Sequence, residues 1–314
     1  MLAVTPTLHG PTPADLEREL LVVGLARDCA RTLEHSVQVL AAALPGFQRV
    51  RWFVVESDSR DDTVAVLQRM AASRPGFEFR SLGQLEPRIP GYTERLAHCR
   101  NACLDYLRAD LDLARIAYVA VADLDGINDG LTAAAVGSCW MRDDWSVCTA
   151  NADGPYYDLW ALRHPRWCPG DCWAESEFIG RHSGNTDSAR RAAVYARMIQ
   201  IPPTADWMEV DSAFGGLAIY RTEALLTARY AGLGADGAAC CEHVPLNLHI
   251  RAQGGRIFIN PELLNAPAAE LRQYWPGREV VARKIDSLLF RTLLRLVYGK
   301  RDAKELRRMI RTVL

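Results

Sequence analysis

The stretch Tyr118-Val-Ala-Val-Ala-Asp-Leu-Asp-Gly126 decides the fold class of this chain, because an apolar run ends there in two carboxylates. An unbroken run of small and β-branched residues is typical of a buried strand in a parallel sheet. Asp123 and Asp125 would then stand at its carboxyl end, where ligands bind in open α/β sheets. Residues i and i+2 of a strand share a face, so both carboxylates can approach one cation. Because Mg²⁺ and Mn²⁺ take oxygen ligands together with substrate phosphates, the pattern indicates a metal–diphosphate site.

The sequence around this stretch alternates between expected strands and expected helices. Apolar runs predict the strands, and apolar residues at helical spacing predict the helices. The strands are expected at residues 20–26, 50–55, 77–80 and 116–122, and the helices at 32–43, 63–72 and 96–108. This alternation predicts an α/β fold with a doubly wound, mainly parallel sheet and helices on both faces.

The second half of the chain is expected to be rich in loops and to build the pocket. Six of the eight tryptophans lie between residues 140 and 207, among Pro, Gly and polar residues. A strand at 217–220, a helix at 242–253 and a strand at 256–260 follow. The predicted organisation is an N-terminal extension (1–19), two halves of one domain (20–130 and 131–265) and a basic helical tail (266–314).

Composition excludes several classes of function. A chain of 314 residues with 49% apolar content can bury the core of one large domain. Its net charge of −1 gives no general attraction to nucleic acid. No window reaches the roughly 18 apolar residues of a membrane span, and residues 1–10 do not resemble a signal peptide. We therefore expect a cytoplasmic protein.

The C-terminal segment differs from the rest of the chain in its charge. Residues 271–314 contain 12 Lys and Arg against 4 Asp and Glu, and residues 285–295 have apolar positions at helical spacing. This amphipathic segment could pack on the core, which we favour, or lie on an anionic membrane surface. The second arrangement would place the protein peripherally at the inner face of the membrane.

The nine cysteines follow no disulfide framework, and a chain of this length does not need one. Cys168 and Cys172, with His164 upstream, could form half of a zinc site. Their spacing is one residue longer than in C-x₂-C, and no second pair matches them. Reduced, mostly buried thiols are therefore the favoured interpretation.

Polar residues also follow the first two expected strands. Residues 55–63 read Val-Glu-Ser-Asp-Ser-Arg-Asp-Asp-Thr, and acceptors such as Glu56 at a strand end suit the donors of a ribose or a nucleobase. Ser59, Asp61 and Asp62 could equally cap the helix that follows, a role compatible with recognition by Glu56. Arg27 and Asp28 form a further polar cluster after the first strand.

Two arginines, Arg95 and Arg100, precede the acidic strand on an expected helix. Arginines beside a metal-bound diphosphate would offset its charge and orient it through forked hydrogen bonds. Salt bridges at the surface are the alternative explanation.

Two later segments complete the constellation. Gly215 and Gly216 precede a strand, and paired glycines allow a ligand to approach the backbone closely. Glu242 and His243 begin a helix, where they could serve as a general base, as a metal ligand, or only as favourable partners of the helix dipole.

Taken in order, these segments resemble a GT-A glycosyltransferase from about residue 20 to residue 261. Residues 55–63 match the V-D-D-G-S-x-D-x-T segment of that family, residues 100–102 its A-R-N-A helix, and residues 123–125 its D-x-D. Residues 242–255 resemble its E-D-x-x-L-x-x-R-L-x-x-x-G helix. The resemblance implies a GT-A-like fold, with a nucleotide-sugar half at 20–130 and an acceptor and catalytic half at 131–265.

Within that fold, four segments look most like the fungal capsule-associated α-1,3-mannosyltransferase family and its bacterial relatives. They are residues 56–59, 157–163, 214–218 and 241–243. The resemblance implies a mannosyltransferase-like enzyme of cell-surface polysaccharide assembly that retains anomeric configuration. GDP-mannose is the favoured donor, a UDP-sugar is the alternative, Mn²⁺ or Mg²⁺ is the cofactor, and a glycan or a lipid-linked molecule is the acceptor.

Roles follow by position in the sequence. The expected donor-binding residues are Arg27, Glu56, Asp58, Arg95, Arg100, Asp123, Gly215 and Gly216. The expected metal ligands are Asp123, Asp125 and His243. Glu242 and His243 are expected to be catalytic, and Asp158 and Trp160 to hold an acceptor sugar.

The sequence departs from the family at two positions. His243 stands where inverting enzymes keep an Asp that deprotonates the acceptor, which argues against an inverting mechanism with a carboxylate base. A late histidine that often completes the metal shell is missing after Pro261, where Asn265 is the nearest polar residue.

Two other functions fit parts of the sequence. A sugar-nucleotide hydrolase or nucleotidyltransferase can also pair a metal with a doubly wound sheet, but residues 24–28 lack the glycine-rich loop that such enzymes often use. A non-catalytic scaffold with the same fold is disfavoured because both aspartates, Glu242 and both arginines are present.

Overall fold

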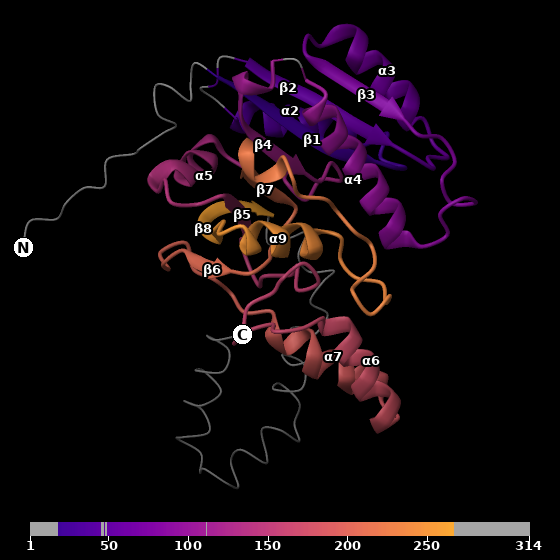
Figure 1. Ribbon diagram of the computed structural model, residues 1–314, viewed down its shortest axis with the longest axis vertical. Helices are drawn as coiled ribbons and strands as arrows, with labels where there is room; N and C mark the ends of the chain where they lie inside the picture. Colours follow the sequence, from indigo (N-terminus) through magenta and orange to yellow (C-terminus); the bar gives the residue numbers. More distant parts are fainter. Residues whose placement is uncertain (1–17, 45–46, 48, 111, 267–314) are drawn as a thin grey trace, which may run out of the picture. The chain divides into compact units, whose positions relative to one another are not determined.

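The computed structural model of the protein describes residues 18–44, 47, 49–110 and 112–266 (Figure 1). The chain divides after residue 270 into two units, and every described residue belongs to the first unit. Residues 1–17 of the expected extension and residues 267–314 of the expected basic tail lie outside the described residues. No helix in the described part is both long enough and apolar enough to span a membrane.

The described residues form an α/β fold around one eight-stranded mixed sheet, in the order β3-β2-β1-β4-β7-β5-β8-β6. The strands are β1 (Glu19–Ala26), β2 (Arg49–Glu56), β3 (Phe77–Ser81), β4 (Ile116–Ala122), β5 (Val147–Ala152), β6 (Met208–Val210), β7 (Leu217–Arg221) and β8 (Ile257–Ala266). Strands β1 to β4 are mutually parallel, and so are β5 and β8. β7 runs antiparallel to β4 and β5, and β6 runs antiparallel to β8. The predicted fold class, with a mainly parallel sheet, is confirmed.

Alternate side chains of each central strand point to opposite faces of the sheet, and both faces are buried under an apolar core. On β1, Leu21 and Val23 belong to one apolar core, whereas Leu20 and Val22 belong to the other. Helices α4 (Tyr92–Arg108) and α9 (His243–Ala252) contribute to the first core, and α2 (Leu33–Ala43) and α3 (Thr63–Ser73) to the second. The sheet is therefore covered on both faces, as the unbroken apolar runs predicted.

The second half of the sequence contains elements that its residue pattern did not predict. They are β5, β6, α5 (Ala133–Gly137), α6 (Cys172–Ser183), α7 (Thr186–Ala193) and α8 (Thr222–Leu225). α6 buries only Cys172 and Ser176, so it lacks the apolar periodicity from which a helix is predicted. Its local signals are Asp171, which accepts hydrogen bonds at the N-cap, and Gly184, which ends the helix in the left-handed region. Long loops remain at residues 153–171 and 226–242, as expected.

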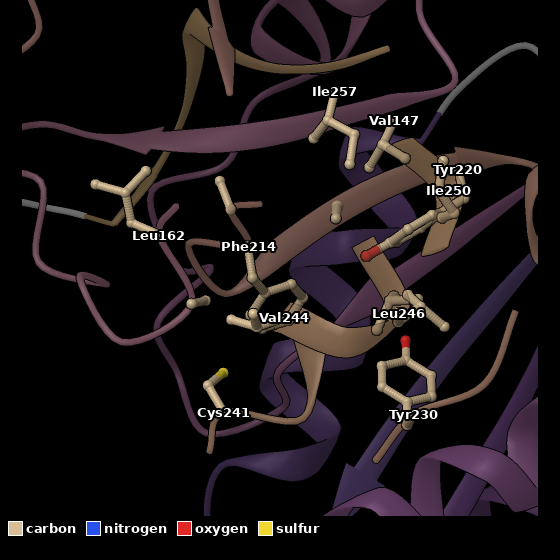
Figure 2. Packing of buried hydrophobic residues seen from close by; sticks show 14 of the residues in the cluster. Val147, Leu162, Phe214, Tyr220, Tyr230, Cys241, Val244, Leu246, Ile250 and Ile257 are labelled. Atoms are coloured by element: carbon tan, nitrogen blue, oxygen red, sulfur yellow. The ribbon is translucent and has the colours of Figure 1, made fainter. Parts of the chain in front are cut away.

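Helix α9 is anchored in the core by one of its faces. Figure 2 shows Val244, Leu246 and Ile250 among the buried side chains that surround Tyr220 and Ile257. This packing fixes the N-terminus of α9, which begins directly after Glu242.

Helix α9 offers a matched test of this packing. Leu246 is fully buried, whereas Leu248, two residues further along the same helix, is 46% exposed. We expect Leu246→Ala to lower the free energy of unfolding by about 2–5 kcal/mol, because it removes buried methyl groups and leaves a cavity. Leu248→Ala should cost less than about 1 kcal/mol. Urea titration followed by circular dichroism would measure both, and equal losses would contradict the packing described.

Candidate active site

A cavity of about 380 Å³ opens at the carboxyl ends of β1, β2 and β4. Its lining includes every site residue predicted from the sequence except Glu56 and Gly215. These lining residues come from positions between Arg27 and His243 in the sequence, and the parallel strands deliver many of them to one edge of the sheet. Ligand sites of open α/β sheets occupy this place.

A buried arginine connects the two sides of the cavity. The Nε–H of Arg100 donates to Oε1 of Glu242 at 2.7 Å, and its Nη2 group donates to Oδ1 of Asp123 at 3.2 Å. The guanidinium carbon lies 5.1 Å from the centre of the Phe214 ring. Only 8% of the Arg100 side chain and 4% of the Glu242 side chain are exposed. Arg100 was expected beside a diphosphate, but its described partners are these two carboxylates and aromatic rings.

The two aspartates after β4 have different surroundings. The backbone N–H of Asp123 donates to the carbonyl of Gly216 at 2.9 Å, and its carboxylate meets Arg100. Burial raises the pKa of Asp123 to about 7, Asp125 and Asp158 add to the rise, and Arg100 opposes it. The Asp125 side chain is exposed, and its Oδ1 accepts one hydrogen bond from the N–H of Ile127 at 3.2 Å.

This arrangement suits a hard divalent cation. Burial raises the pKa of Asp123 most, and repulsion by the Asp125 and Asp158 carboxylates raises it further. A cation between Asp123 and Asp125 would relieve this repulsion. Asp123 and Asp125 would hold the ion, with oxygen donors of the type that Mg²⁺ and Mn²⁺ prefer. No three His, Cys, Asp or Glu side chains of the described residues form a ready ligand cluster. Two carboxylates with further oxygens from a bound phosphate are a usual set for such ions.

His243, the expected third ligand, lies in a mostly apolar environment. Its ring stacks on Phe214 with the ring centres 3.9 Å apart, and it meets the ring of Tyr230 edge-on at 5.4 Å. Its Nε2 lies 3.6 Å from Oε1 of Glu242. Burial and the nearby charge of Arg100 lower the pKa of His243 well below its usual value, so the ring is neutral. Neither ring nitrogen has a hydrogen-bond partner among the described residues.

The Gly215–Gly216 pair forms a tight turn, of which Gly216 lines the cavity. Both residues have positive φ (72° and 83°), which favours glycine. A Cβ atom would lie 2.8 Å from the carbonyl oxygen of Ala150 at Gly215, and 2.8 Å from a methyl group of Ile127 at Gly216. No larger residue fits this turn without a shift of its neighbours.

Two buried asparagines hold this turn. The amide of Asn265 donates to the carbonyl of Gly215 at 2.7 Å and to Oδ1 of Asn128 at 2.8 Å. The amide of Asn128 donates to the carbonyls of Asp123 and Gly216, at 2.8 and 3.0 Å. Asn128 therefore connects the acidic strand end to the glycine turn. It was not predicted as a site residue, because a single asparagine in a loop carries no pattern.

Asp158 and Trp160 both line the cavity, as expected. Oδ2 of Asp158 accepts the N–H of Gly215 at 2.8 Å, and burial raises the pKa of Asp158. The indole N–H of Trp160 donates to Oδ2 of Asp171 at 2.9 Å, which fixes the ring beside the cavity.

The polar residues after β2 divide into two groups. Glu56 is 2% exposed, and its carboxylate accepts hydrogen bonds from the N–H of Ser59 at 3.0 Å and from the hydroxyl of Ser81. This carboxylate is absent from the cavity lining, and its contact with a base or ribose stays a prediction. Asp58 does line the cavity.

Asp58 is held in an unusual conformation. Its φ of 59° lies in the left-handed region, where a residue other than glycine is strained. Its Oδ1 accepts the N–H groups of Leu85 and Glu86, at 2.8 and 2.9 Å. Burial alone would raise the pKa of Asp58, but these hydrogen bonds lower it below the usual value. The acid is therefore held ionised at the cavity wall.

The two other predicted arginines also line the cavity. The Arg27 side chain is 37% exposed, and its Nε lies 3.8 Å from Oδ2 of Asp28. The Nη1 group of Arg95 donates to the carbonyls of Ile89 and Pro90, at 2.9 and 2.7 Å. Arg95 thus holds the loop before α4, and Arg27 is the more accessible cation.

Tyr92 is a cavity residue that the sequence did not suggest. It begins α4, lines the cavity and is 57% exposed. Partial burial raises the pKa of Tyr92, and the charges of Glu242 and Asp123 raise it further. Tyr92 therefore adds an aromatic side chain to the cavity that Glu242 and Asp123 also line. The only local signal was an aromatic residue after Gly91, which is too common to indicate a site.

The Cys168–Cys172 segment shows no sign of a zinc site in the described residues. Both thiols are fully buried, and Nδ1 of His164 accepts the backbone N–H groups of Arg166 and Trp167. Free, mostly buried cysteines are the observed state of all nine residues.

The sequence matches no protein-family model and no curated protein. Among solved structures, the fold is similar to the mannosyltransferase PcManGT from Pyrobaculum calidifontis in complex with GDP-Man and Mn²⁺, at 17% identity and a TM-score of 0.48. That match covers 85% of this chain and 59% of the other chain.

Two further solved structures are similar in fold. TarS 1-349 from S. aureus in complex with UDP-GlcNAc matches at 14% identity and a TM-score of 0.43, over 80% of this chain and 58% of that one. The second is glucosyl-3-phosphoglycerate synthase from Mycobacterium tuberculosis in complex with Mn²⁺, UDP-Glc and phosphoglyceric acid, which matches at 14% identity and a TM-score of 0.38. That match covers 91% of this chain and 84% of the other chain. At these identities the likeness concerns the fold alone, so a functional conclusion has to come from the side chains of the cavity.

The ion pairs of Arg100 lead to a stability prediction. Arg100→Met should lower the free energy of unfolding by about 3–5 kcal/mol, because it leaves the buried Glu242 carboxylate without a partner. The double variant Arg100→Met/Glu242→Gln should lose less than the two single variants together. Chemical denaturation of the four proteins would measure this coupling.

Arg27→Met provides the control, because Arg27 lines the same cavity but is partly exposed. Its effect should stay below about 1 kcal/mol. Additivity of the Arg100 and Glu242 substitutions within about 0.5 kcal/mol would contradict the coupling.

Proposed function

We propose that this protein is a metal-dependent glycosyltransferase that moves a sugar from a nucleotide-sugar donor to a glycan or a lipid-linked acceptor. One observation carries the proposal: Asp123 and Asp125 share a cavity with Glu242, and Arg100 holds Glu242 and Asp123 together. The carboxylates that would hold the metal and the acid at the start of α9 would then belong to one reaction centre.

Breaking the bond between a sugar and a diphosphate requires stabilisation of the leaving group. A Mn²⁺ or Mg²⁺ ion held by Asp123 and Asp125 would act as a Lewis acid on the diphosphate. Arg27, the most accessible of the three cavity arginines, would add a second positive charge beside it. Arg100 would hold Asp123 in place through the hydrogen bond to its carboxylate, and its charge would also offset that of the diphosphate.

The remaining cavity residues fit recognition of the donor and the acceptor. Asp58, which is ionised and held by backbone N–H groups, would accept hydrogen bonds from a ribose or a base. The Gly215–Gly216 turn would lie beneath the donor sugar, since Gly216 lines the cavity. Asp158 and Trp160 offer a carboxylate and an aromatic face to a sugar ring. Glu242 and His243 would guide the acceptor hydroxyl.

The finer assignment follows the resemblance of residues 56–59, 157–163, 214–218 and 241–243 to mannosyltransferases. It favours GDP-mannose over a UDP-sugar, retention of the anomeric configuration, and a place in cell-surface polysaccharide assembly. A lipid-linked acceptor would suit the basic residues of 271–314, because positive charge attracts anionic membrane surfaces.

Donor turnover tests the class of enzyme. We expect one member of a panel of GDP-, UDP- and CMP-sugars to release nucleotide when Mn²⁺ is present. The same donor should stay intact when EDTA removes the metal. Asp125→Asn should lower the rate at least about 100-fold, because it removes a direct metal ligand, whereas loss of outer-shell partners costs 10–100-fold. Nucleotide release would be followed by a coupled phosphatase assay.

The matched control is Asp129→Asn, which changes an exposed aspartate of the same loop that does not line the cavity. It should turn over the donor at the wild-type rate. Full activity of Asp125→Asn, or unchanged donor binding after EDTA treatment, would refute the metal assignment. Free sugar or a nucleotidyl product in place of a glycoside would identify a hydrolase or a nucleotidyltransferase.

The stereochemical outcome is a separate prediction. We expect an α-linked donor to give an α-linked product, because His243 occupies the place of the carboxylate base of inverting enzymes and is itself neutral and buried. The anomeric proton of the new glycoside, observed by ¹H NMR during the reaction, reports the configuration directly. A β-linked product would overturn retention while leaving the transferase assignment intact.

A further inference from the structure

The hairpin of α6 and α7 has a second cavity of its own. It measures about 430 Å³, within the range of small-molecule sites. Its α6 residues are Trp173, Ser176, Glu177, Gly180 and Arg181, whose spacing places them on one face of the helix. Thr186 and Arg190 of α7 complete the lining. In Figure 1, the two helices lie side by side and project away from β1 to β4.

The lining has the chemistry of a carbohydrate site. Trp173 is 41% exposed, although a large aromatic side chain gains free energy when it is buried. A sugar ring has a face of C–H bonds that can cover such an indole, and its hydroxyls need donors and acceptors at the rim. The cavity supplies hydroxyl, carboxylate and guanidinium groups for them. Glu177 pairs with Arg181, so part of the charge is already neutralised.

A single carboxylate connects this cavity to the candidate active site. Oδ1 of Asp171 accepts the N–H groups of Trp173 and Ala174, which caps α6. Oδ2 of the same residue accepts the indole N–H of Trp160, which lines the active-site cavity. The side chain of Arg163 also donates to this Oδ2, at 3.4 Å. Asp171 thus holds Trp160 of the active-site cavity and also the start of α6, the helix that lines the second cavity.

We propose that the α6–α7 cavity is a second carbohydrate subsite, which binds a part of the oligosaccharide acceptor away from the reacting end. The proposal rests on the proposed function, because it takes the active-site cavity as the place where the acceptor reacts. Trp173 would stack on one sugar unit, and Glu177, Arg181 and Arg190 would bind its hydroxyls. An acceptor held at two cavities would bind more tightly than one held at the reacting end alone.

The test measures binding of an oligosaccharide array, with α-linked mannose oligomers of two to six units included, to the full-length protein. We expect wild type to bind at least one oligosaccharide and Trp173→Ala to weaken that binding about tenfold or more. Trp173→Phe should restore most of it, because it keeps an aromatic face. Isothermal titration with the selected oligosaccharide gives the dissociation constants.

Phe178→Ala is the matched control. Phe178 is 62% exposed on the same helix but does not line the cavity. This variant should bind the oligosaccharide as wild type does. Equal binding by wild type and Trp173→Ala, equal loss in Phe178→Ala, or no oligosaccharide bound by wild type would overturn the proposal. A change of oligomeric state in Trp173→Ala with sugar affinity intact would also overturn it, in favour of a protein interface.

Asp125→Asn separates this proposal from the proposed function. The variant should lose donor turnover, because Asp125 is a proposed metal ligand on the donor side, and should keep the oligosaccharide binding that depends on Trp173, because Trp173 lies in the α6–α7 cavity. Binding that depends on Trp173 in a protein without donor turnover would support a carbohydrate site and refute the transferase. Donor turnover by wild type, together with oligosaccharide binding that Trp173→Ala leaves unchanged, would support the transferase and refute the carbohydrate site.

Discussion

The candidate active site depends on the burial of one guanidinium group. Arg100 lies between the carboxylates of Glu242 and Asp123 and against the rings of Phe214 and Tyr230. A buried charge is costly unless it is paired, so this arginine requires both acids to be in place. The two ion pairs of Arg100 thereby fix the end of β4 against the start of α9, and these elements are far apart in the sequence. The packing of α9 and the position of the acidic strand end are therefore coupled through a single side chain.

The cavity around Arg100 combines buried groups that are held by hydrogen bonds with exposed groups that a ligand can reach. Asn128 and Asn265 hold the Gly215–Gly216 turn by hydrogen bonds within a fully buried network. Asp125 and Arg27 remain exposed at the opening. Such a division suits a site in which a metal and a charged substrate bind to a preorganised wall, because the protein does not have to reorganise its dipoles during the reaction.

Much of the fold followed from local patterns. The first-half strands and helices begin and end within a few residues of their predicted positions, because buried parallel strands are unbroken apolar runs and the helices between them are amphipathic. α4 begins four residues earlier than expected, at Tyr92, and β8 continues to Ala266. β5, β6, α6 and α7 escaped prediction for different reasons. Each of the two helices buries only two residues, and β6 has only three residues, so hydrophobicity does not mark them. β5 is fully buried, but its sequence Val-Cys-Thr-Ala-Asn-Ala is not an unbroken apolar run.

The sequence by itself determined the fold class and the acidic strand end at Asp123 and Asp125, since both follow from hydrophobicity and charge in neighbouring residues. Only the tertiary structure decided which groups meet. Arg100 lies between two carboxylates, and Glu56 accepts hydrogen bonds from Ser59 and Ser81. Asn128 donates to the carbonyl of Gly216 in the glycine turn. The physical reason is that hydrogen bonds and ion pairs between distant segments depend on the geometry of the whole sheet, and no local pattern encodes that geometry.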